Sequence, residues 1–243
     1  MGKTYRLTPV LALLSIWILS PSVCTAQRAD PGKTDTLATD GRIVYSSFRP
    51  AGWDVYHVEQ PGGAPRRLTH DPALDYDAVL SPDGRWVVFT SERGGSPDLF
   101  ALDLERTGPP RLLVESEAME DQAALSPDGE WLAFVGTASG NAEVYLLPFD
   151  PDSTRGMGDA VNLTRHPGGD FRPDFSPDGR HIAFSSDRDA TPTPHPRFPF
   201  AFQREGELYV TDRNGGEARR LTDSPGWDGS PVWAPDGSFV YFY

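Results

Sequence analysis

The sequence predicts an all-β fold, a propeller of four-stranded blades, from three observations. A phrase of serine or alanine followed by Pro-Asp-Gly occurs four times, with its aspartates at 83, 128, 178 and 236. The intervals of 45, 50 and 58 residues match a unit of about four short strands. An alternating apolar strand follows each copy, and nothing after residue 27 carries the apolar period of a helix. We therefore expect almost no helix beyond residue 27.

The chain begins with a segment, residues 1–26, that is typical of a signal peptide. It has basic residues at Lys3 and Arg6, an apolar run over residues 10–19, and small residues up to Ala26. A membrane span needs about 20 apolar residues, and this run is shorter. We therefore expect cleavage after Ala26 rather than retention as a membrane anchor.

Cys24 raises the alternative of a lipidated N-terminus. Val23 precedes it, whereas a lipoprotein signal has glycine, alanine or serine there, so cleavage after Ala26 remains our prediction. The cleaved chain would contain no cysteine, and its formal net charge would fall from −13 to −15. This charge disfavours nucleic acid and anionic lipid as partners. We expect no membrane span after cleavage.

A polar linker, residues 27–33, leads into the repeats, which we expect to occupy residues 34–243. A weaker copy of the turn at Asp40-Gly41 opens the series. In each full copy, proline presets the first corner of a type I turn, aspartate can accept hydrogen bonds from nearby amides, and glycine accepts a left-handed conformation. The strands that follow are rich in β-branched and aromatic residues. They lie at residues 42–45, 85–89, 130–134, 180–184 and 238–242.

Two further strands recur in each unit. One consists of an acidic, an aliphatic and an aromatic residue, at residues 54–56, 98–100, 143–145 and 207–209. The other has leucine at its centre, at residues 67–69, 111–113, 162–164 and 220–222. The order of these elements resembles the WD-like repeat of TolB-type β-propellers, over roughly residues 34–243. Similar repeats occur in the propeller half of prolyl-oligopeptidase-like serine peptidases and in oligogalacturonate lyases.

The strand count predicts an incomplete ring. We expect about 17 strands from residue 41 onward, which make four to five blades, whereas a propeller of this family usually has six. A chain truncated at its C-terminus is the simplest explanation, and a closed four-bladed ring is the alternative. An open array would expose unpaired strand edges, so we expect it to aggregate or to recruit a partner strand.

The inner strand of each unit supplies the candidate binding residues. Six positions before each turn stands an acidic residue, which could form a ring of carboxylates at the mouth of the channel. Local capping of a neighbouring loop is the alternative that we favour. Two positions nearer the turn the residue type varies, so this position is less constrained by the scaffold. The acidic series is Asp75, Glu120, Asp170 and Asp228, and the variable series is Asp77, Gln122, Arg172 and Ser230.

The stretch from Asp187 to Glu207 is longer than its counterpart from Ser91 to Asp98 and is rich in proline and phenylalanine. It is a candidate partner loop, or a segment that folds back over a blade edge. Its candidate contact residues are His195, Phe198, Phe200 and Phe202.

Catalysis has little support in the sequence. The five histidines show no pair at metal-ligand spacing, although His70 and His166 both follow a leucine-centred strand, and no Gly-x-Ser-x-Gly motif occurs. We therefore predict no catalytic residue, metal or cofactor. We expect an exported non-enzymatic protein, periplasmic or secreted, that binds a protein or peptide partner through its loop face and channel, as the TolB resemblance implies. The alternatives are the gating propeller of a serine peptidase whose catalytic domain lies elsewhere, and a metal-dependent oligogalacturonate lyase.

Overall fold

The computed structural model describes residues 41–49, 52–190, 193–194, 201–202 and 205–243. The expected signal peptide, residues 1–26, and linker, residues 27–33, lie outside the described residues. No helix in the described part of the chain is long and apolar enough to cross a membrane.

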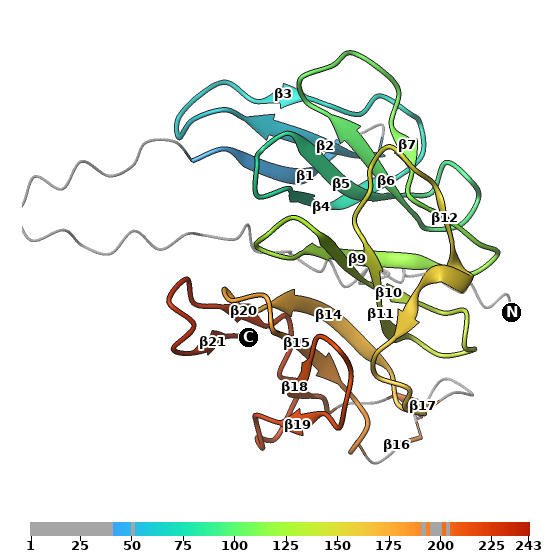
Figure 1. Ribbon diagram of the computed structural model, residues 1–243, viewed down its shortest axis with the longest axis vertical. Helices are drawn as coiled ribbons and strands as arrows, with labels where there is room; N and C mark the ends of the chain where they lie inside the picture. The colour runs from blue at the N-terminus through green and yellow to red at the C-terminus, as the bar shows by residue number, and fades with distance from the viewer. Residues whose placement is uncertain (1–40, 50–51, 191–192, 195–200, 203–204) are drawn as a thin grey trace, which may run out of the picture. The chain divides into compact units, whose positions relative to one another are not determined.

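The strands form a series of antiparallel sheets that follow one another along the chain (Figure 1). Blade 1 contains β1 (Ile43–Arg49), β2 (Gly52–Val58) and β3 (Arg66–Arg67). Blade 2 contains β4 (Asp75–Leu80), β5 (Trp86–Ser91), β6 (Asp98–Asp103) and β7 (Arg111–Leu112). Each strand pairs with the next, so the blades are simple meanders.

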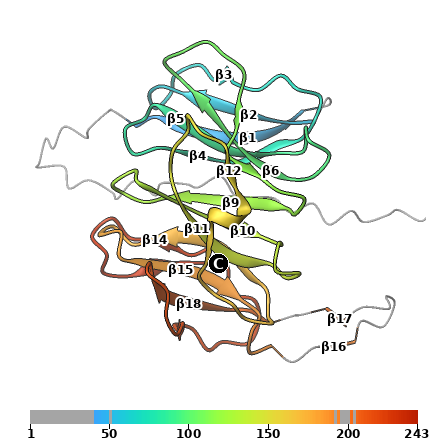
Figure 2. The ribbon, with the colours of Figure 1, turned by 45° about the vertical axis from the view of Figure 1, so that its right-hand side comes forward.

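Blade 3 contains β9 (Glu120–Leu125), β10 (Trp131–Gly136), β11 (Glu143–Pro148) and β13 (Val161–Asn162). Blade 4 contains β14 (Asp170–Phe175), β15 (His181–Ser186), β18 (Glu207–Asp212) and β19 (Arg219–Arg220). A fifth sheet begins with β20 (Val232–Trp233) and β21 (Val240–Tyr241). Figure 2 shows these sheets following one another along the chain. The prediction of four to five blades of four-stranded type is confirmed.

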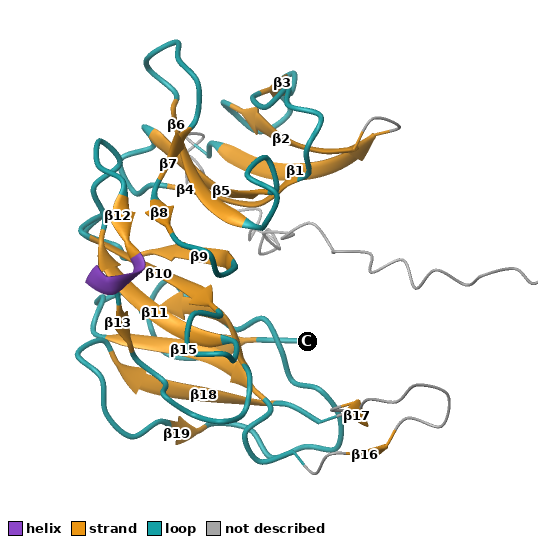
Figure 3. Cartoon of the chain, turned by 90° about the vertical axis from the view of Figure 1, so that its right-hand side faces the viewer, coloured by secondary structure: helices purple, strands orange, loops and turns teal. Residues whose placement is uncertain are grey.

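The remaining elements are short insertions. β8 (Val114–Glu115) pairs in parallel with β12 (Arg155–Gly156), and β16 (Thr193–Pro194) pairs with β17 (Ala201–Phe202). The one helix in the described residues is the three-residue 3₁₀ turn Met157–Asp159, drawn in purple in Figure 3. The near absence of helix is confirmed for this part of the chain.

The repeated turns fold as their chemistry predicts. In the first turn the Ser81 hydroxyl donates to Asp83 and accepts from the Trp86 amide, while Asp83 also accepts from the Arg85 amide. These hydrogen bonds lower the pKa of Asp83. Gly84 has a φ of 71°, in the left-handed region that glycine tolerates. The turns at Ser126 and Ser176 repeat the arrangement.

The hydrophobic core lies between neighbouring blades. One cluster joins blades 1 and 2 around Val55 and Phe89, a second joins blades 2 and 3 around Leu99 and Phe134, and a third joins blades 3 and 4 around Val144. Packing therefore ties each blade to the next, as in other repeat folds.

The strand order places the loops at two ends of the sheets. The Ser-Pro-Asp-Gly turns and the hairpins to the outer strands share one end, which we call the turn face. The loops that join the second to the third strand of a blade, and each blade to the next, share the other end, which we call the loop face. The first strands, β4, β9 and β14, lie at one edge of their sheets, the inner edge.

Candidate functional site

The four variable positions of the inner strands share an unusual backbone conformation. Their φ values are all positive, from 48° to 55°, although none of the residues is glycine: Asp77, Gln122, Arg172 and Ser230. In β4, β9 and β14 the position coincides with a shift in strand register, a β-bulge. A non-glycine residue in the left-handed region costs about 1–2 kcal/mol. Bulges of this kind re-aim a side chain, and strained residues concentrate at functional sites.

Three of these residues come together from three different blades. The Arg172 guanidinium of blade 4 lies 3.3 Å from the Asp77 carboxylate of blade 2. The Arg172 amide donates to the Gln122 side-chain oxygen of blade 3 at 2.8 Å. We call Asp77, Gln122 and Arg172 the channel cluster. Its side chains are partly exposed, 34% for Arg172 and 15% for Asp77, so a partner can reach them.

Ser230 does not join the channel cluster. Its hydroxyl donates to the Tyr243 hydroxyl at 3.1 Å, and its amide donates to Ser185. Its positive φ nevertheless gives it the same backbone geometry as the other three positions.

The structure adds two residues that the sequence analysis did not single out. Burial and the nearby Asp77 raise the pKa of Asp121, which accepts a hydrogen bond from Thr90 at 2.8 Å. Burial, followed by the charge of Asp121, raises the pKa of Tyr76 above its usual range. Both residues stand one position before the left-handed residue of their strand. The residue type at this repeat position also varies between the units, and this variation could have identified both residues from the sequence.

The acidic series lies at the start of the inner strands and is buried. Asp75 pairs with Arg93 at 3.0 Å, and Asp170 pairs with Arg188 at 2.9 Å. Asp228 accepts a hydrogen bond from Ser224 at 2.7 Å. These local partners match the capping alternative. A role of this series in binding a partner stays a prediction.

The two arginines are themselves held by their own blades. Arg93 donates to the Ser91 hydroxyl and lies over the Phe100 ring, and Arg188 does the same with Ser186 and the Tyr209 ring. Asp75 and Asp170 are thus each part of a corner built from carboxylate, guanidinium, hydroxyl and aromatic ring, which we call the ionic corner.

Blade 3 lacks the ionic corner. Gly136 and Ala138 stand in place of the serine and the arginine, and Glu120 accepts a hydrogen bond from Ser116 instead. Glu120 is fully buried, and one of its carboxylate oxygens has no hydrogen-bond partner. Burial raises the pKa of Glu120 to about 7.

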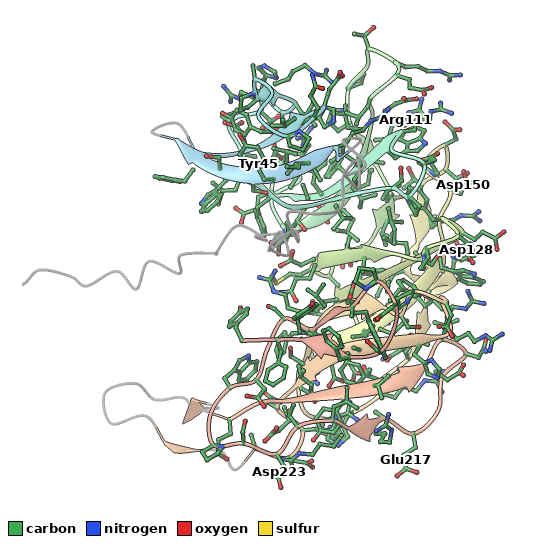
Figure 4. The ribbon with its side chains drawn as sticks, turned by 90° about the vertical axis from the view of Figure 1, so that its left-hand side faces the viewer. Tyr45, Arg111, Asp128, Asp150, Glu217 and Asp223 are labelled. Carbon is green, nitrogen blue, oxygen red and sulfur yellow. The ribbon has the colours of Figure 1, made fainter. Side chains whose placement is uncertain are left out.

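An insertion covers this part of blade 3. Residues 149–160, which we call the strap, contain β12, and the Arg155 amide donates to the Leu113 carbonyl. The strap places the Met157 methyl carbon 2.8 Å from the position that a Cβ on Gly136 would take. Arg111 pairs with Asp152 of the strap, and Figure 4 shows Arg111 and Asp150 on the same side of the molecule. Met157 therefore fills space that glycine leaves open.

Little of the candidate partner loop is described. His195, Phe198 and Phe200 lie outside the described residues. Phe202 belongs to β17, where its backbone pairs with Thr193. The loop therefore stays a prediction.

The candidate histidines do not form a metal centre in the described residues, where no group of three histidine, cysteine, aspartate or glutamate side chains could hold an ion. The His166 ring nitrogen Nδ1 accepts from the Gly168 amide, and the Asn141 side chain donates to the carbonyls of both residues. His166 thus helps to shape its loop.

No protein-family model matches the sequence. Three curated proteins are similar to it. An uncharacterised peptidase, YuxL, of Bacillus subtilis is 40% identical over 68 residues, which cover 28% of the chain and 8% of that protein. An uncharacterised protein of Agrobacterium fabrum is 29% identical over 207 residues, 83% of the chain and 51% of that protein. The TolB protein of Desulfosudis oleivorans is 29% identical over 104 residues, 43% of the chain and 23% of that protein.

Solved structures of other proteins have a similar fold. TolB from Acinetobacter baumannii superposes with a TM-score of 0.67 at 21% identity, over 84% of the chain and 47% of that protein. A protein assigned as TolB from Agrobacterium tumefaciens superposes with a TM-score of 0.65 at 25% identity, over 83% of the chain and 70% of that protein. The described residues therefore have a β-propeller fold similar to that of TolB proteins.

A third structure shares the propeller at lower similarity. A puromycin-hydrolysing peptidase of Mycobacterium tuberculosis superposes with a TM-score of 0.58 at 20% identity, over 82% of the chain and 33% of that protein. This likeness shows the fold alone. The chain spans about half the length of the Agrobacterium fabrum relative and a smaller share of the other two curated relatives.

Proposed function

We propose that this TolB-type propeller is a non-enzymatic scaffold that binds a protein or peptide partner through its inner edge and loop face. The observation that carries the proposal is the channel cluster. Three blades hold residues in a strained left-handed conformation at the same repeat position, and these residues contact one another although their side chains differ from blade to blade. If the left-handed conformation served only the fold, a different polar side chain in each blade would not be required.

The cluster offers a partner both signs of charge. Arg172 can bind a carboxylate or a backbone carbonyl through its guanidinium donors, while Asp77, with Asp121 nearby, can bind an amine or a guanidinium. A partner segment that inserts here would exchange the Asp77–Arg172 ion pair for contacts of its own. Because both side chains are partly exposed already, this exchange requires no unfolding of a blade.

Site-specific photocrosslinking in the producing cells tests the proposal. A photoreactive residue at Ala138, which is exposed on the loop face, is expected to give a discrete protein adduct that Arg172→Gln abolishes. The same residue at Glu217, exposed on the turn face, is the matched control and is expected to give none. Equal adducts from both positions, or an adduct that Arg172→Gln leaves unchanged, would rule out binding through the channel cluster.

The setting that we propose is the bacterial envelope, with the protein periplasmic or secreted. It rests on the signal-peptide pattern of residues 1–26 and on the likeness to TolB proteins. The partner would then be envelope-associated. Mass spectrometry of the protein from cells distinguishes the outcomes, because cleavage after Ala26 leaves an unmodified Gln27, whereas lipidation leaves a modified Cys24.

A second function is favoured by one specific observation, the 40% identity over 68 residues to an uncharacterised peptidase. In this alternative the propeller gates the active site of a serine peptidase. Genomic DNA read past the codon for Tyr243 decides between the two. A frame that continues into a Gly-x-Ser-x-Gly domain would support the peptidase, and a frame that adds only propeller repeats would support the scaffold.

A further inference from the structure

Two buried carboxyl groups lie at the junction of blades 2 and 3. Glu120 begins β9 of blade 3, and its amide donates to the Pro97 carbonyl of blade 2 at 2.8 Å. Asp98, the next residue along the chain from Pro97, begins β6. Glu120 is fully buried, and Asp98 is 8% exposed. We call Glu120 and Asp98 the carboxyl pair.

Asp98 lacks the cation that holds the equivalent acid in other blades. In blade 1 the acid at this position, Asp54, pairs with Arg67 of the outer strand at 2.6 Å, and blade 4 has the same arrangement. The corresponding arginine of blade 2, Arg111, pairs with Asp152 of the strap instead. Asp98 accepts a hydrogen bond from Ser96 at 3.4 Å. Its negative charge is therefore poorly compensated.

Glu120 lacks its cation as well, because blade 3 has no ionic corner. One carboxylate oxygen accepts from the Ser116 hydroxyl, and the other has no hydrogen-bond partner. The charged group that acts on Glu120 from the neighbouring elements is Asp98, which has the same sign. Arg155 of the strap pairs with Asp150 at 3.3 Å. A second negative charge in the carboxyl pair is therefore strongly unfavourable while the site excludes water.

A short segment of the loop face, residues 116–119, holds Glu120 through Ser116, and we call it the Ser116 loop. The Ala118 amide donates to the Ser116 hydroxyl at 2.9 Å, and the Met119 amide donates to the Thr137 hydroxyl at 3.0 Å. The Met119 side chain is 46% exposed. The loop is thus held by a few hydrogen bonds near the surface, so opening it costs less free energy than unfolding a blade.

We propose that the carboxyl pair and the Ser116 loop form a pH-sensitive switch: with a proton on Glu120 the loop stays closed, and once both carboxyl groups are ionised the loop opens and water reaches Glu120. Glu120 loses its proton to solvent, and its carboxylate gains hydration in the open state. Blades 2 and 4 cannot switch in this way, because an arginine compensates the acid at the same position. The switch does not depend on the function proposed above.

The direction of the switch follows from the titration of Glu120. Burial, together with the charge of Asp98, raises its pKa from 4.5 to about 7 in the closed state. In the open state the carboxyl group is solvated, and its pKa returns toward 4.5. The free energy of opening is therefore highest below pH 4.5, falls as the pH rises to 7, and is constant above. The open population should rise by up to about 300-fold across this window.

Hydrogen exchange of the full chain from pH 4.5 to pH 8, followed by nuclear magnetic resonance, tests the proposal. The measured quantity is the protection factor, which is corrected for the intrinsic effect of pH on exchange. The amides of Met119 and Glu120 are expected to lose protection by up to about 300-fold between pH 4.5 and pH 7, and no more above. Protection that is constant from pH 4.5 to pH 8 would overturn the proposal.

Low concentrations of urea distinguish loop opening from unfolding of the whole propeller. Opening of the Ser116 loop exposes little surface, so exchange of the Glu120 amide at pH 7 should be insensitive to urea below the unfolding transition. Exchange that accelerates with urea as steeply as that of the buried Phe184 amide of β15 would contradict a local switch.

Three variants assign the effect to the carboxyl pair. Glu120→Gln is neutral at every pH, so its protection factors should not change across the window. Asp98→Asn should reduce the change, because Glu120 then ionises without a second negative charge beside it. Glu117→Gln, which alters an exposed glutamate of the same loop, is the matched control and should behave as the wild type. A fall in protection of wild-type size in Glu120→Gln or in Asp98→Asn would overturn the switch.

Discussion

Blades 2 and 4 differ from blade 3 at the corner where the inner strand begins. In blades 2 and 4 a buried aspartate pairs with an arginine that lies over an aromatic ring of the same blade. In blade 3 the arginine is absent, the buried acid is Glu120, and Met157 of the strap lies against the site. The same corner of the repeat is therefore filled by a buried ion pair in blades 2 and 4, and by an unpaired glutamate and a methionine in blade 3.

The aromatic pair is the part that all these blades share. Phe89 and Phe100, Phe134 and Tyr145, and Phe184 and Tyr209 stack at centroid distances of 5.8 to 6.2 Å. A ring face can bind either a guanidinium or a thioether, because cation–π and sulphur–aromatic contacts are both favourable. The repeat therefore keeps the stacked aromatic pair, which we call the ring platform. The group that lies beside this pair differs, since it is an arginine in blades 2 and 4 and a methionine in blade 3.

The largest expected effect concerns the ionic corner of blade 4. Arg188→Ala leaves the carboxylate of Asp170 fully buried with no cation, so the free energy of unfolding should fall by about 3–5 kcal/mol. Urea denaturation measures this loss. Arg180→Ala, which removes an exposed arginine of the same blade, is the control and should change it by less than about 0.5 kcal/mol. Similar small losses in both variants would mean that the ionic corner does not hold blade 4 together.

The second effect concerns the pH dependence of blade 3. The pKa of Glu120 is raised from 4.5 to about 7 in the folded protein, so its stabilising contribution is complete below pH 4.5 and is lost as the pH rises to 7. The loss should be about 3 kcal/mol. Glu120→Gln stays neutral at every pH, so relative to the wild type it should become more stable as the pH rises across this window.

Urea denaturation from about pH 4.5 to pH 8 measures the difference between Glu120→Gln and the wild type across the window that the shifted pKa defines. Glu130→Gln, which alters an exposed glutamate in the same blade, should run parallel to the wild type. If the difference between Glu120→Gln and the wild type stays constant throughout, Glu120 titrates normally.

The fold could be predicted well from the sequence because it depends on local chemistry. The Ser-Pro-Asp-Gly turns set their own conformation through hydrogen bonds within a few residues, as Ser81 and Asp83 show. The strands that follow the turns, such as Trp86–Ser91, have a pattern that specifies burial without reference to the rest of the chain. Repetition then fixes the architecture, since one correct unit predicts the others.

The candidate site was predictable only in part because its contacts cross blades. The variation among Asp77, Gln122 and Arg172 was visible, but the ion pair joins residues 95 positions apart, and the positive φ has no signature in residue type. The strap was not predicted because Met157 reaches Gly136 through an insertion outside the repeat.

The smallest expected effect concerns the strap. Met157→Ala removes a partly buried thioether that packs with the Phe134 and Tyr145 cluster, so the free energy of unfolding should fall by about 1–2 kcal/mol. Met119→Ala, an exposed methionine on the loop face of the same blade, should change it little, and urea denaturation compares the two. A loss near zero in Met157→Ala would indicate that blade 3 is stable on its aromatic pair alone. In that case blade 3 would not need the methionine beside its aromatic pair. Blades 2 and 4 would still need their arginines, because a buried aspartate without a cation is strongly destabilising.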